Sequence, residues 1–232
     1  MSLRRWEDLP NSMRTEEVRP YYDSLVRKRG QLALKRVLDV AGAAALLVIL
    51  SPVMLVLAVA IKLDSPGPVF FRQERVGRYG EPFCIFKFRT MVVGAESRGA
   101  QVTSGSDPRV TRVGSVIRKY RLDEFPQLLD VLRGTMSFVG TRPEVPRYVA
   151  AYTPEMAATL LMPPGVTSRA SVEFRDEAAL LEGTADPGAA YVTEVLPRKM
   201  AVNLGSVMGF GVADDLRTVC STVSSVFGRG DA

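Results

Sequence analysis

The longest apolar stretch of this chain is a run of 22 uncharged residues between Asp39 and Lys62, VAGAAALLVILSPVMLVLAVAI. As one straight helix it would measure about 33 Å, which is enough to cross the hydrocarbon core of a bilayer. Pro52 lies near the middle of the run. Because a proline cannot donate a backbone hydrogen bond and disfavours helical angles at the preceding residue, the run predicts a membrane helix with a break at Ser51 and Pro52.

Basic residues lie on both sides of this run. They are Arg27, Lys28, Arg29, Lys35 and Arg36 before it, and Lys62, Arg72 and Arg75 after it. A helix that spans a membrane carries Lys and Arg mainly in its cytoplasmic flank. Two basic flanks therefore favour a re-entrant helix over residues 31–63, with both ends on the cytoplasmic face. An ordinary single-pass helix remains the alternative, because prolines occur in membrane helices.

Outside the run, the pattern predicts a helix-rich α/β fold. Residues 1–30 are polar and contain Pro10 and Pro20, so we expect an extension that is not part of the core. Residues 64–232 are long enough for one cytoplasmic domain. We expect amphipathic helices of this domain to lie along the membrane surface.

Two periodicities appear within residues 64–232. Segments 69–77 and 81–91, on either side of Arg78-Tyr79-Gly80, alternate or are apolar and predict a small β-hairpin. Helical spacing of apolar residues predicts two helices in 113–133 that meet near Asp123, and further helices at 148–162, 191–204 and 212–227. Residues 170–177 are predicted to form a short strand.

The net charge of +5 is distributed unevenly along the chain. Residues 1–36 sum to +4 and residues 62–150 to +6, whereas residues 151–232 sum to −4. The basic part adjoins the apolar run, so anionic lipid headgroups or phosphate ligands are natural partners. Nucleic acid is not expected, because basic and acidic residues are interleaved and no nucleic-acid motif is present.

The chain contains no histidine, which excludes Ser-His-Asp and Cys-His catalysis and any His-ligated metal. Its two cysteines, Cys84 and Cys220, are isolated and lack metal-ligand spacing, so we expect reduced thiols in a cytoplasmic domain. Catalysis would then depend on carboxylates, basic residues and a hard cation such as Mg²⁺.

The segment LDEFPQLLDVLRG, residues 122–134, has one apolar helical face and places Pro126 most easily in the first turn. Asp123 and Glu124, hereafter the acidic pair, would then lie at a helix N-terminus. Free N–H groups and the helix dipole favour anions there, so we expect both carboxylates to be ionised. The alternative is structural, because Asp is a common N-cap and Glu a common first-turn residue.

Three short segments supply cations that suit such a pair. KFRT offers Lys87 and Arg89 on one face of a strand, RKYR precedes the pair at 118–121, and GTRPE places Arg142 in a rigid loop. A carboxylate that attacks a phosphate meets like-charge repulsion, which a divalent ion and bidentate arginines reduce. Each cation taken alone is better explained as a solvated surface charge or a lipid-headgroup contact.

The motifs KRVLD, an apolar segment with an internal Ser-Pro, SPGPVFFRQERVG, FKFRTM, LDEFPQLLDVLRG, MSFVGTRP and PPGVT follow one another in this order. This order resembles the bacterial sugar transferase family, the monotopic polyprenyl-phosphate phosphoglycosyl transferases, closely over residues 34–177. The resemblance implies an enzyme of the bacterial inner membrane, facing the cytoplasm. It would move a sugar-1-phosphate from a nucleotide sugar, typically a UDP-sugar, to a membrane polyprenyl phosphate in glycoconjugate synthesis.

The resemblance also implies roles for single residues. In the family, the Asp of an Asp-Glu pair attacks the sugar-linked phosphate and forms a covalent phosphosugar-aspartyl intermediate; here that residue is Asp123. Glu124 would serve as metal ligand or proton acceptor, with Mg²⁺ at the acidic pair. Arg142 would contact the donor phosphate, beside Lys87 and Arg89. The family's Ser-Pro break implies a re-entrant helix, in agreement with the two basic flanks.

The sequence departs from the family pattern at Thr135, where Asp is common, at Thr141, where Pro is common, and at Ser168-Arg169, where Gly-Trp is usual. These positions lie near the expected donor pocket, so the identity of the sugar stays open. The oligomeric state also stays open, and a homodimer is among the expected assemblies. A different class of function, a non-catalytic membrane-anchored adaptor that binds anionic lipid or a partner protein, is the alternative to the enzyme.

Overall fold

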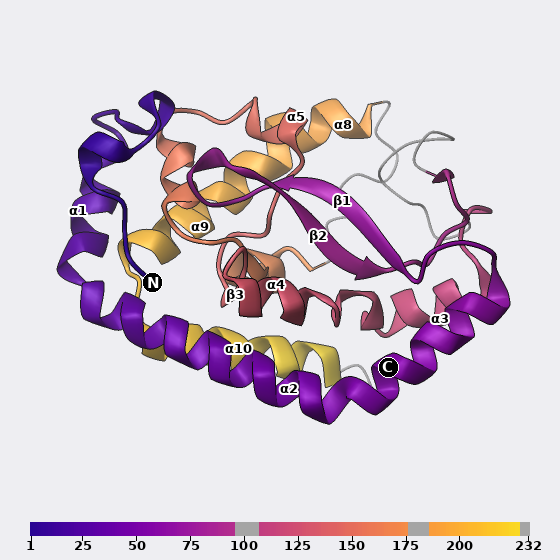
Figure 1. Ribbon diagram of the computed structural model, residues 1–232. Coiled ribbons are helices and arrows are strands. Elements are labelled where there is room, and N and C mark those ends of the chain that lie inside the picture. Colours follow the sequence, from indigo (N-terminus) through magenta and orange to yellow (C-terminus); the bar gives the residue numbers. More distant parts are fainter. Residues whose placement is uncertain (96–106, 176–185, 228–232) are drawn as a thin grey trace.

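The computed structural model describes residues 1–95, 107–175 and 186–227. One long helix, α2 (Arg29–Asp64), runs along one side of the molecule (Figure 1). The hairpin of β1 (Phe70–Val76) and β2 (Pro82–Phe88) lies across from it. Between the hairpin and α2 lie three short helices, which are α3 (Arg112–Lys119), the 3₁₀ turn η5 (Leu122–Glu124) and α4 (Gln127–Arg133).

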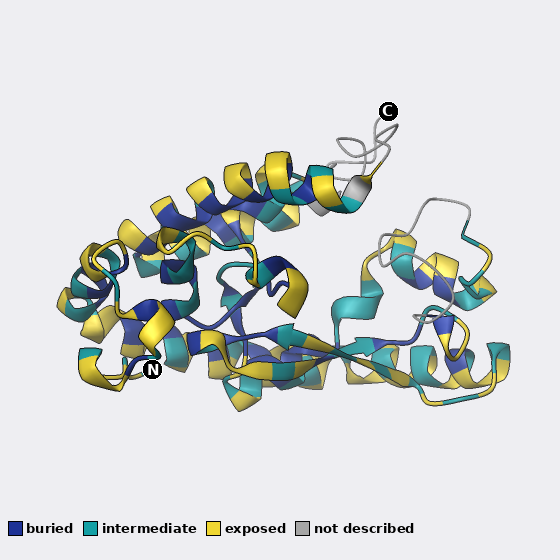
Figure 2. Cartoon of the chain, turned by 90° about the horizontal axis from the view of Figure 1, so that it is seen from above, coloured by how far each residue is buried: buried dark blue, intermediate teal, exposed yellow. Residues whose placement is uncertain are grey.

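The other elements complete the two ends of the molecule. Before α2 come the 3₁₀ turns η1 (Trp6–Asp8) and η2 (Asn11–Met13) and helix α1 (Arg19–Arg27). After α4 come β3 (Ser137–Val139), α5 (Pro146–Val149), the 3₁₀ helix η6 (Glu155–Leu161), β4 (Gly165–Thr167), α6 (Arg169–Glu173), α8 (Pro187–Ala190), the π-helix η7 (Tyr191–Val195), α9 (Leu196–Met208) and α10 (Val212–Phe227). Strands β3 and β4 pair in parallel. Buried residues face the interior and exposed ones the outer sides of the helices (Figure 2).

Helix α2 continues through the position where the sequence predicted a break. The hydroxyl of Ser51 donates to the carbonyl of Val48 at 2.8 Å, which is the carbonyl that the missing N–H of Pro52 would otherwise have bonded. Figure 1 shows α2 changing direction partway along its length, and Pro52 is the proline inside it. The expected break is therefore a bend in a continuous helix, as is usual where a proline removes one helical bond. A re-entrant course in a membrane remains a prediction.

Most of α2 exposes large apolar side chains, among them Val48, Ile49, Leu55, Val56 and Leu63, which are 67% to 84% exposed. In the described part of the chain, α2 is the one helix long and apolar enough to cross a membrane. Polar contacts at its N-terminal half join it to the rest of the protein. Because exposed apolar surface of this extent is unfavourable in water, α2 marks a surface for contact with lipid or another apolar partner.

Residues 1–30 belong to the core, which corrects the expectation of a detached extension. Leu9, Met13, Val18 and Leu25 are at most 3% exposed and pack in one cluster with side chains from η6 and α9. Tyr79 of the hairpin turn joins the same cluster. The sequence pattern did not predict this packing, because the segment contains prolines and many charges and only a few apolar residues. Those apolar residues come from η1, η2, α1 and the residues beside them, and each contacts the core.

The predicted hairpin is present, with Phe71 of β1 opposite Lys87 of β2 in an antiparallel register. Tyr79 in its turn has a φ of +61°. The helices predicted near 113–133, 191–204 and 212–227 are also confirmed, whereas 148–162 forms the shorter α5 and η6. The strand predicted at 170–177 is wrong for its described part: Ser168 accepts a bond from Ser171 N at 2.9 Å and caps helix α6. Residues 176 and 177 lie outside the described residues.

Replacing Ser51 and Pro52 together by Leu is expected to straighten α2, because residue 52 regains an N–H that can bond the Val48 carbonyl. Spin labels at the exposed positions Leu38 and Leu63, in a protein whose Cys84 and Cys220 are replaced by Ser, would report the change. Their backbone separation should increase toward about 37 Å, the span of 25 residues of straight helix. A Leu55→Ala control, which leaves Pro52 in place, should keep the shorter distance. An unchanged distance in the double variant would place the cause of the bend elsewhere.

Candidate active site

The acidic pair lies in the one-turn helix η5, between α3 and α4. Arg121, just before it, has the left-handed φ of +53°, which is uncommon for a residue with a side chain. Pro126 directly precedes the first residue of α4, where its missing donor costs little. Leu122 and Phe125 on either side of the pair pack against an apolar cluster built on Ile117. The turn is therefore fixed by burial of its apolar neighbours, and the pair is held by its backbone.

Two predicted cations meet the carboxylate of Glu124. Arg142 Nη2 donates to Glu124 Oε1 at 2.5 Å, and Lys87 Nζ lies 3.5 Å from the same oxygen. The side chains are partly covered: Glu124 is 14% exposed, Lys87 18% and Arg142 34%. Lys87 comes from β2, and Arg142 comes from the loop after β3. We name Asp123, Glu124, Lys87 and Arg142 the acid–base cluster; its members come from three separate segments of the chain.

The structure separates the two carboxylates, which the sequence analysis treated alike. Burial raises the pKa of Asp123, and the neighbouring charge of Glu124 raises it further. Burial acts in the same direction on Glu124, but the charges of Arg142 and Lys87 and the hydrogen bond from Arg142 outweigh it and lower the pKa to about 2. Glu124 is thus ionised at neutral pH while Arg142 and Lys87 are in place. Asp123 is the more basic carboxylate, which is the property that a nucleophile needs.

The two cations are themselves perturbed. Burial lowers the pKa of Lys87, while the charge of Glu124 acts to raise it. The pKa of Arg142 is raised, chiefly by the charge of Glu124, so its guanidinium stays charged. An anionic group entering the cluster would therefore meet at least one fixed positive charge. Because these charges are held in place before a ligand binds, little reorganisation is needed.

The sequence analysis missed Arg75. Its guanidinium donates to the carbonyl of Pro143 at 3.0 Å and to Gln73 Oε1 at 2.6 Å, and burial lowers its pKa. Alternation along β1 placed Gln73 and Arg75 on the same, more buried face as Phe71. Polar residues on the more buried face of a strand need hydrogen-bond partners there, so this pattern could have identified Arg75 as a residue with a structural or functional role.

The loop that carries Arg142 requires a glycine at its start. A Cβ on Gly140 would lie 2.5 Å from the carbonyl oxygen of Pro163 and 2.9 Å from Gly165 N, so no other residue fits without moving backbone. Gly140 N donates to Thr167 O at 3.0 Å, and Gly165 N donates to Thr141 O at 3.0 Å. The GTRPE loop is thus fastened to β4. Arg142 also lines a small hollow together with Thr141, Glu144 and Tyr152.

Arg89 does not join the acid–base cluster, which corrects its assignment as a phosphate contact. Its side chain is 5% exposed and donates to the carbonyls of Ser65 at 2.7 Å and Pro66 at 2.8 Å. These carbonyls follow the last turn of α2, so the guanidinium fixes the exit of the chain from that helix. Lys87 and Arg89 therefore have different roles, although they are only two residues apart in the chain.

The departures from the family pattern have local structural roles. Thr135 Oγ1 donates to the carbonyl of Asp130 at 3.1 Å, at the end of α4, and Ser168 caps α6. Thr141 lines the hollow beside Arg142. Ser51 and Pro52 belong to α2 and have no contact with the cluster among the bonds described for them.

Asp123 and Glu124 offer carboxylate oxygens, the ligand type that Mg²⁺ prefers. Mg²⁺ binds through one or two carboxylates together with substrate phosphates and waters, and Asp123 and Glu124 are adjacent carboxylates. No group of three or more acidic or cysteine residues that could form an all-protein cage occurs among the described residues. Any metal here would therefore depend on substrate oxygens for the rest of its ligands.

The fold and the site together define the class of protein. The chain combines one long apolar helix with a partly buried turn whose two carboxylates lie close to two cations from other segments, a set of charges that suits a phosphate ligand. Comparison with known proteins then gives the family, because the model of the bacterial sugar transferases matches residues 30–229. This chain belongs to the bacterial sugar transferase family and is a transferase.

The chain is also similar in sequence to individual proteins with curated names. A UDP-glucose:undecaprenyl-phosphate glucose-1-phosphate transferase of Caulobacter vibrioides is 40% identical over 201 residues, 85% of this chain and 71% of the relative. The exopolysaccharide production protein PSS of Rhizobium leguminosarum is 36% identical over 207 residues, 86% of this chain and 98% of the relative. A UDP-N-acetylgalactosamine-undecaprenyl-phosphate N-acetylgalactosaminephosphotransferase of Aeromonas hydrophila is 45% identical over 142 residues, 60% of this chain and 34% of the relative. The chain thus spans about a third of the Aeromonas relative.

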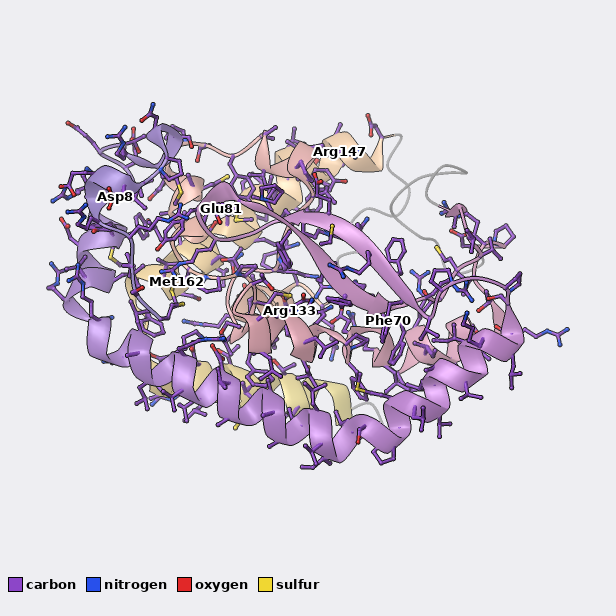
Figure 3. The ribbon with its side chains drawn as sticks, in the orientation of Figure 1. Asp8, Phe70, Glu81, Arg133, Arg147 and Met162 are labelled. Carbon is purple, nitrogen blue, oxygen red and sulfur yellow. The ribbon has the colours of Figure 1, made fainter. Side chains whose placement is uncertain are left out.

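Figure 3 shows the side chains of the whole molecule and labels Phe70, the first residue of β1, and Arg133, the last residue of α4. All four members of the acid–base cluster come from segments that follow α2 in the chain, so none of them belongs to the exposed apolar surface of that helix.

Replacing Lys87 by Gln is expected to move the acid limb of the activity profile to higher pH. The charge of Lys87 lowers the pKa of Asp123, so its loss raises that pKa, and the ionised carboxylate is then lost at a higher pH on acidification. Steady-state kinetics of the transferase between about pH 4 and 8 would locate the limb, whatever the change in maximal rate. Arg72→Gln, on the exposed face of the same hairpin, removes an equal charge and should leave the limb unchanged. A shift to lower pH, or equal shifts in both variants, would contradict the electrostatic link.

Proposed function

We propose that this chain transfers a sugar-1-phosphate from a nucleotide sugar, with UDP as the expected nucleotide, to a polyprenyl phosphate in a bacterial membrane. This would be the first membrane step in the synthesis of a glycoconjugate such as an exopolysaccharide. The observation that carries the proposal is the acidic pair: Asp123 has a raised pKa beside Glu124, which is itself held by Arg142 and Lys87. The names of the relatives from Caulobacter and Aeromonas support the same donor and acceptor classes.

In the proposed first step, a carboxylate oxygen of Asp123 attacks the sugar-linked phosphorus of the donor. The bond from that phosphorus to the bridging oxygen breaks, and the nucleoside monophosphate leaves with the electron pair. In the second step, a phosphate oxygen of the polyprenyl phosphate attacks the same phosphorus, and the bond to Asp123 breaks. The products are a polyprenyl diphosphate sugar and the free carboxylate. Splitting the transfer in this way replaces one difficult displacement by two easier ones.

The neighbours of Asp123 have separate roles in this scheme. Arg142 and Lys87 screen the repulsion between the attacking carboxylate and the phosphates, and Arg142 offers a planar fork for two phosphate oxygens. Since Glu124 occupies Arg142 through the bond at 2.5 Å, an arriving phosphate must share or exchange that contact. This exchange would release the Glu124 carboxylate from Arg142, and Glu124 could then accept a proton or bind a metal ion.

Asp123 and Glu124 are the residues that would hold Mg²⁺. When bound, the ion would neutralise charge on the donor's phosphate oxygens and on the leaving group. The residues of this chain do the rest: Asp123 supplies the nucleophile, and Lys87 and Arg142 orient the phosphates.

The location follows from α2. We propose that its exposed apolar surface lies in the cytoplasmic leaflet of the inner membrane, with the bend at Pro52 returning the helix to the face it entered from. The active site would then lie at headgroup level, where the phosphate of the acceptor is found. Membership of the transferase family favours this enzyme over a non-catalytic adaptor. The identity of the sugar stays open, because Thr141 differs from the family pattern beside Arg142.

Asp123→Asn is expected to reduce turnover by at least about 100-fold while the fold is retained, because an amide is nearly isosteric but a poor nucleophile toward phosphorus. The measurement is release of nucleoside monophosphate from a UDP-sugar in the absence of lipid acceptor, together with mass detection of a phosphosugar adduct. Asp23→Asn on the exposed face of α1 is the matched control and should form the adduct normally. If the Asp123→Asn protein kept more than about a tenth of the wild-type rate, Asp123 would be a structural cap.

Cysteines introduced at Ala33 and Pro66, near the two ends of α2, should both be shielded from a membrane-impermeant thiol reagent in intact cells. The reason is that a re-entrant helix keeps both ends on the cytoplasmic face. The native Cys84 and Cys220 are exposed and must first be replaced by Ser. Lysed cells, in which both sites should react, give the control. Labelling of one site from outside would establish a helix that spans the membrane.

A further inference from the structure

A second buried network of charged and polar groups lies behind the loop that carries Arg142. Tyr191 Oη donates to Glu144 Oε1 at 2.5 Å, Lys199 Nζ donates to Tyr191 Oη at 2.9 Å, and Lys199 lies 3.5 Å from Glu144. The three residues are between 4% and 7% exposed. We name Glu144, Tyr191 and Lys199 the support network; none of them was singled out from the sequence.

The network depends on an unusual piece of backbone. Tyr191 is the first residue of the π-helix η7, and π-helical turns are rare and often occur at functional sites. Its ring packs against Tyr148 with the centroids 4.6 Å apart, and Lys199 reaches the same hydroxyl from α9. Two elements from the C-terminal part of the chain therefore converge on one carboxylate, two residues after Arg142.

Stability alone gives little reason for such a network. Burying an ammonium and a carboxylate costs solvation energy that their attraction often only offsets, so well-packed apolar residues would serve a core about as well. A network of this kind is better at fixing one arrangement of groups, since every member needs its partner in place. The question is therefore which group the support network holds in position.

The contacts point to the segment from Arg142 to Glu144. Arg75 donates to the carbonyl of Pro143 at 3.0 Å, and Val76 N donates to the carbonyl of Glu144 at 2.9 Å. Tyr191 of η7 binds the Glu144 side chain, and Arg75 and Val76 of β1 bind the backbone. This short segment is therefore held by a strand and by a helix. The Arg142 side chain is itself a third exposed, so its aim toward the acidic pair depends on the backbone that carries it.

Charge gives a second link between the two sets of residues. The charge of Glu144 is among those that raise the pKa of Arg142, and it also acts on Arg75. An unpaired Glu144 would attract these guanidinium groups and repel the phosphates of a donor. Lys199 balances that carboxylate from the far side and leaves Arg142 available to Glu124 and to a ligand.

We propose that Glu144, Tyr191 and Lys199 are positioning residues that hold Arg142 ready for the donor phosphates. This inference rests on the proposed function, in which Arg142 contacts the donor. The network touches no substrate; it acts through the backbone of the loop and through the charge balance around Arg142. Its loss should therefore weaken donor binding more than it changes stability.

The test is a double-mutant cycle between Tyr191 and Arg142. Tyr191→Phe removes one hydroxyl and keeps the ring; it should lower kcat/KM for the nucleotide sugar about five-fold, mainly through KM, the scale of one hydrogen bond. Arg142→Ala alone should lose more. In the Arg142→Ala background, Tyr191→Phe should cause no further loss, because the group it positions is gone. Equilibrium binding of the nucleotide sugar to the Asp123→Asn protein gives a readout that does not need turnover.

Tyr22→Phe is the matched control. It removes another buried tyrosine hydroxyl, which donates to the carbonyl of Arg4 at 3.0 Å, and should leave the donor KM unchanged even if it lowers the melting temperature equally. If Tyr191→Phe lowered kcat/KM by the same factor in the wild-type and Arg142→Ala backgrounds, the network would be purely structural and the inference would fail. Wild-type kinetics in Arg142→Ala would instead refute the phosphate contact in the proposed function. If Tyr191→Phe does not fold, Lys199→Met, which keeps chain length and burial, replaces it in the cycle and should show the same coupling.

Discussion

The attachment of α2 to the rest of the protein is the contact on which the site depends. Lys35 pairs with Asp215 of α10 at 2.6 Å, and Arg36 donates to the carbonyls of Val131 and Leu132 at the end of α4. Asp39 accepts from the Ser137 hydroxyl at 2.8 Å and from Phe138 N at 3.2 Å. Helix α4 follows the acidic pair, and β3 leads into the Arg142 loop. Little more than one turn of α2 therefore contacts both segments that carry the candidate active site. It does so with side chains such as Lys35 and Asp39, which are buried and therefore need polar partners.

This attachment explains why an exposed apolar helix and a polar catalytic cluster occur in one small chain. In the proposed reaction, the acceptor phosphate of a polyprenyl lipid would lie at a fixed depth in the membrane, so a site that acts on it would have to be held at that depth. A flexible tether would allow the two carboxylates to move relative to α2, whereas Arg36 and Asp39 hold α4 and β3 directly against that helix and Lys35 holds α10. The bend at Pro52, with the Val48 carbonyl satisfied by Ser51, then sets the direction in which the remaining apolar turns leave the domain.

Within the site, burial and charge give two neighbouring acids different properties. Burial alone would raise the pKa of both, and only Glu124 has cations close enough to reverse the effect. Arg142 contributes most to that reversal, and it is also the residue at which the acid–base cluster and the support network meet. The pKa of Asp123 is therefore set by burial and by the charge of Glu124 beside it, with Lys87 and Arg142 acting in the opposite direction.

The sequence by itself determined the apolar helix, the hairpin, the helices on either side of Asp123 and the pairing of that residue with Glu124, because all of these are recorded in local spacing. Lys87 and Arg142 were also predicted, since phosphate chemistry needs cations near carboxylates. Only the tertiary structure decided that Arg89 fastens the end of α2, that residues 1–30 belong to the core, and that Arg75, Glu144, Tyr191 and Lys199 support the loop. These roles depend on which distant partner completes each buried polar group, and a partner more than a hundred residues away, like Asp215 for Lys35, leaves no local pattern in the chain.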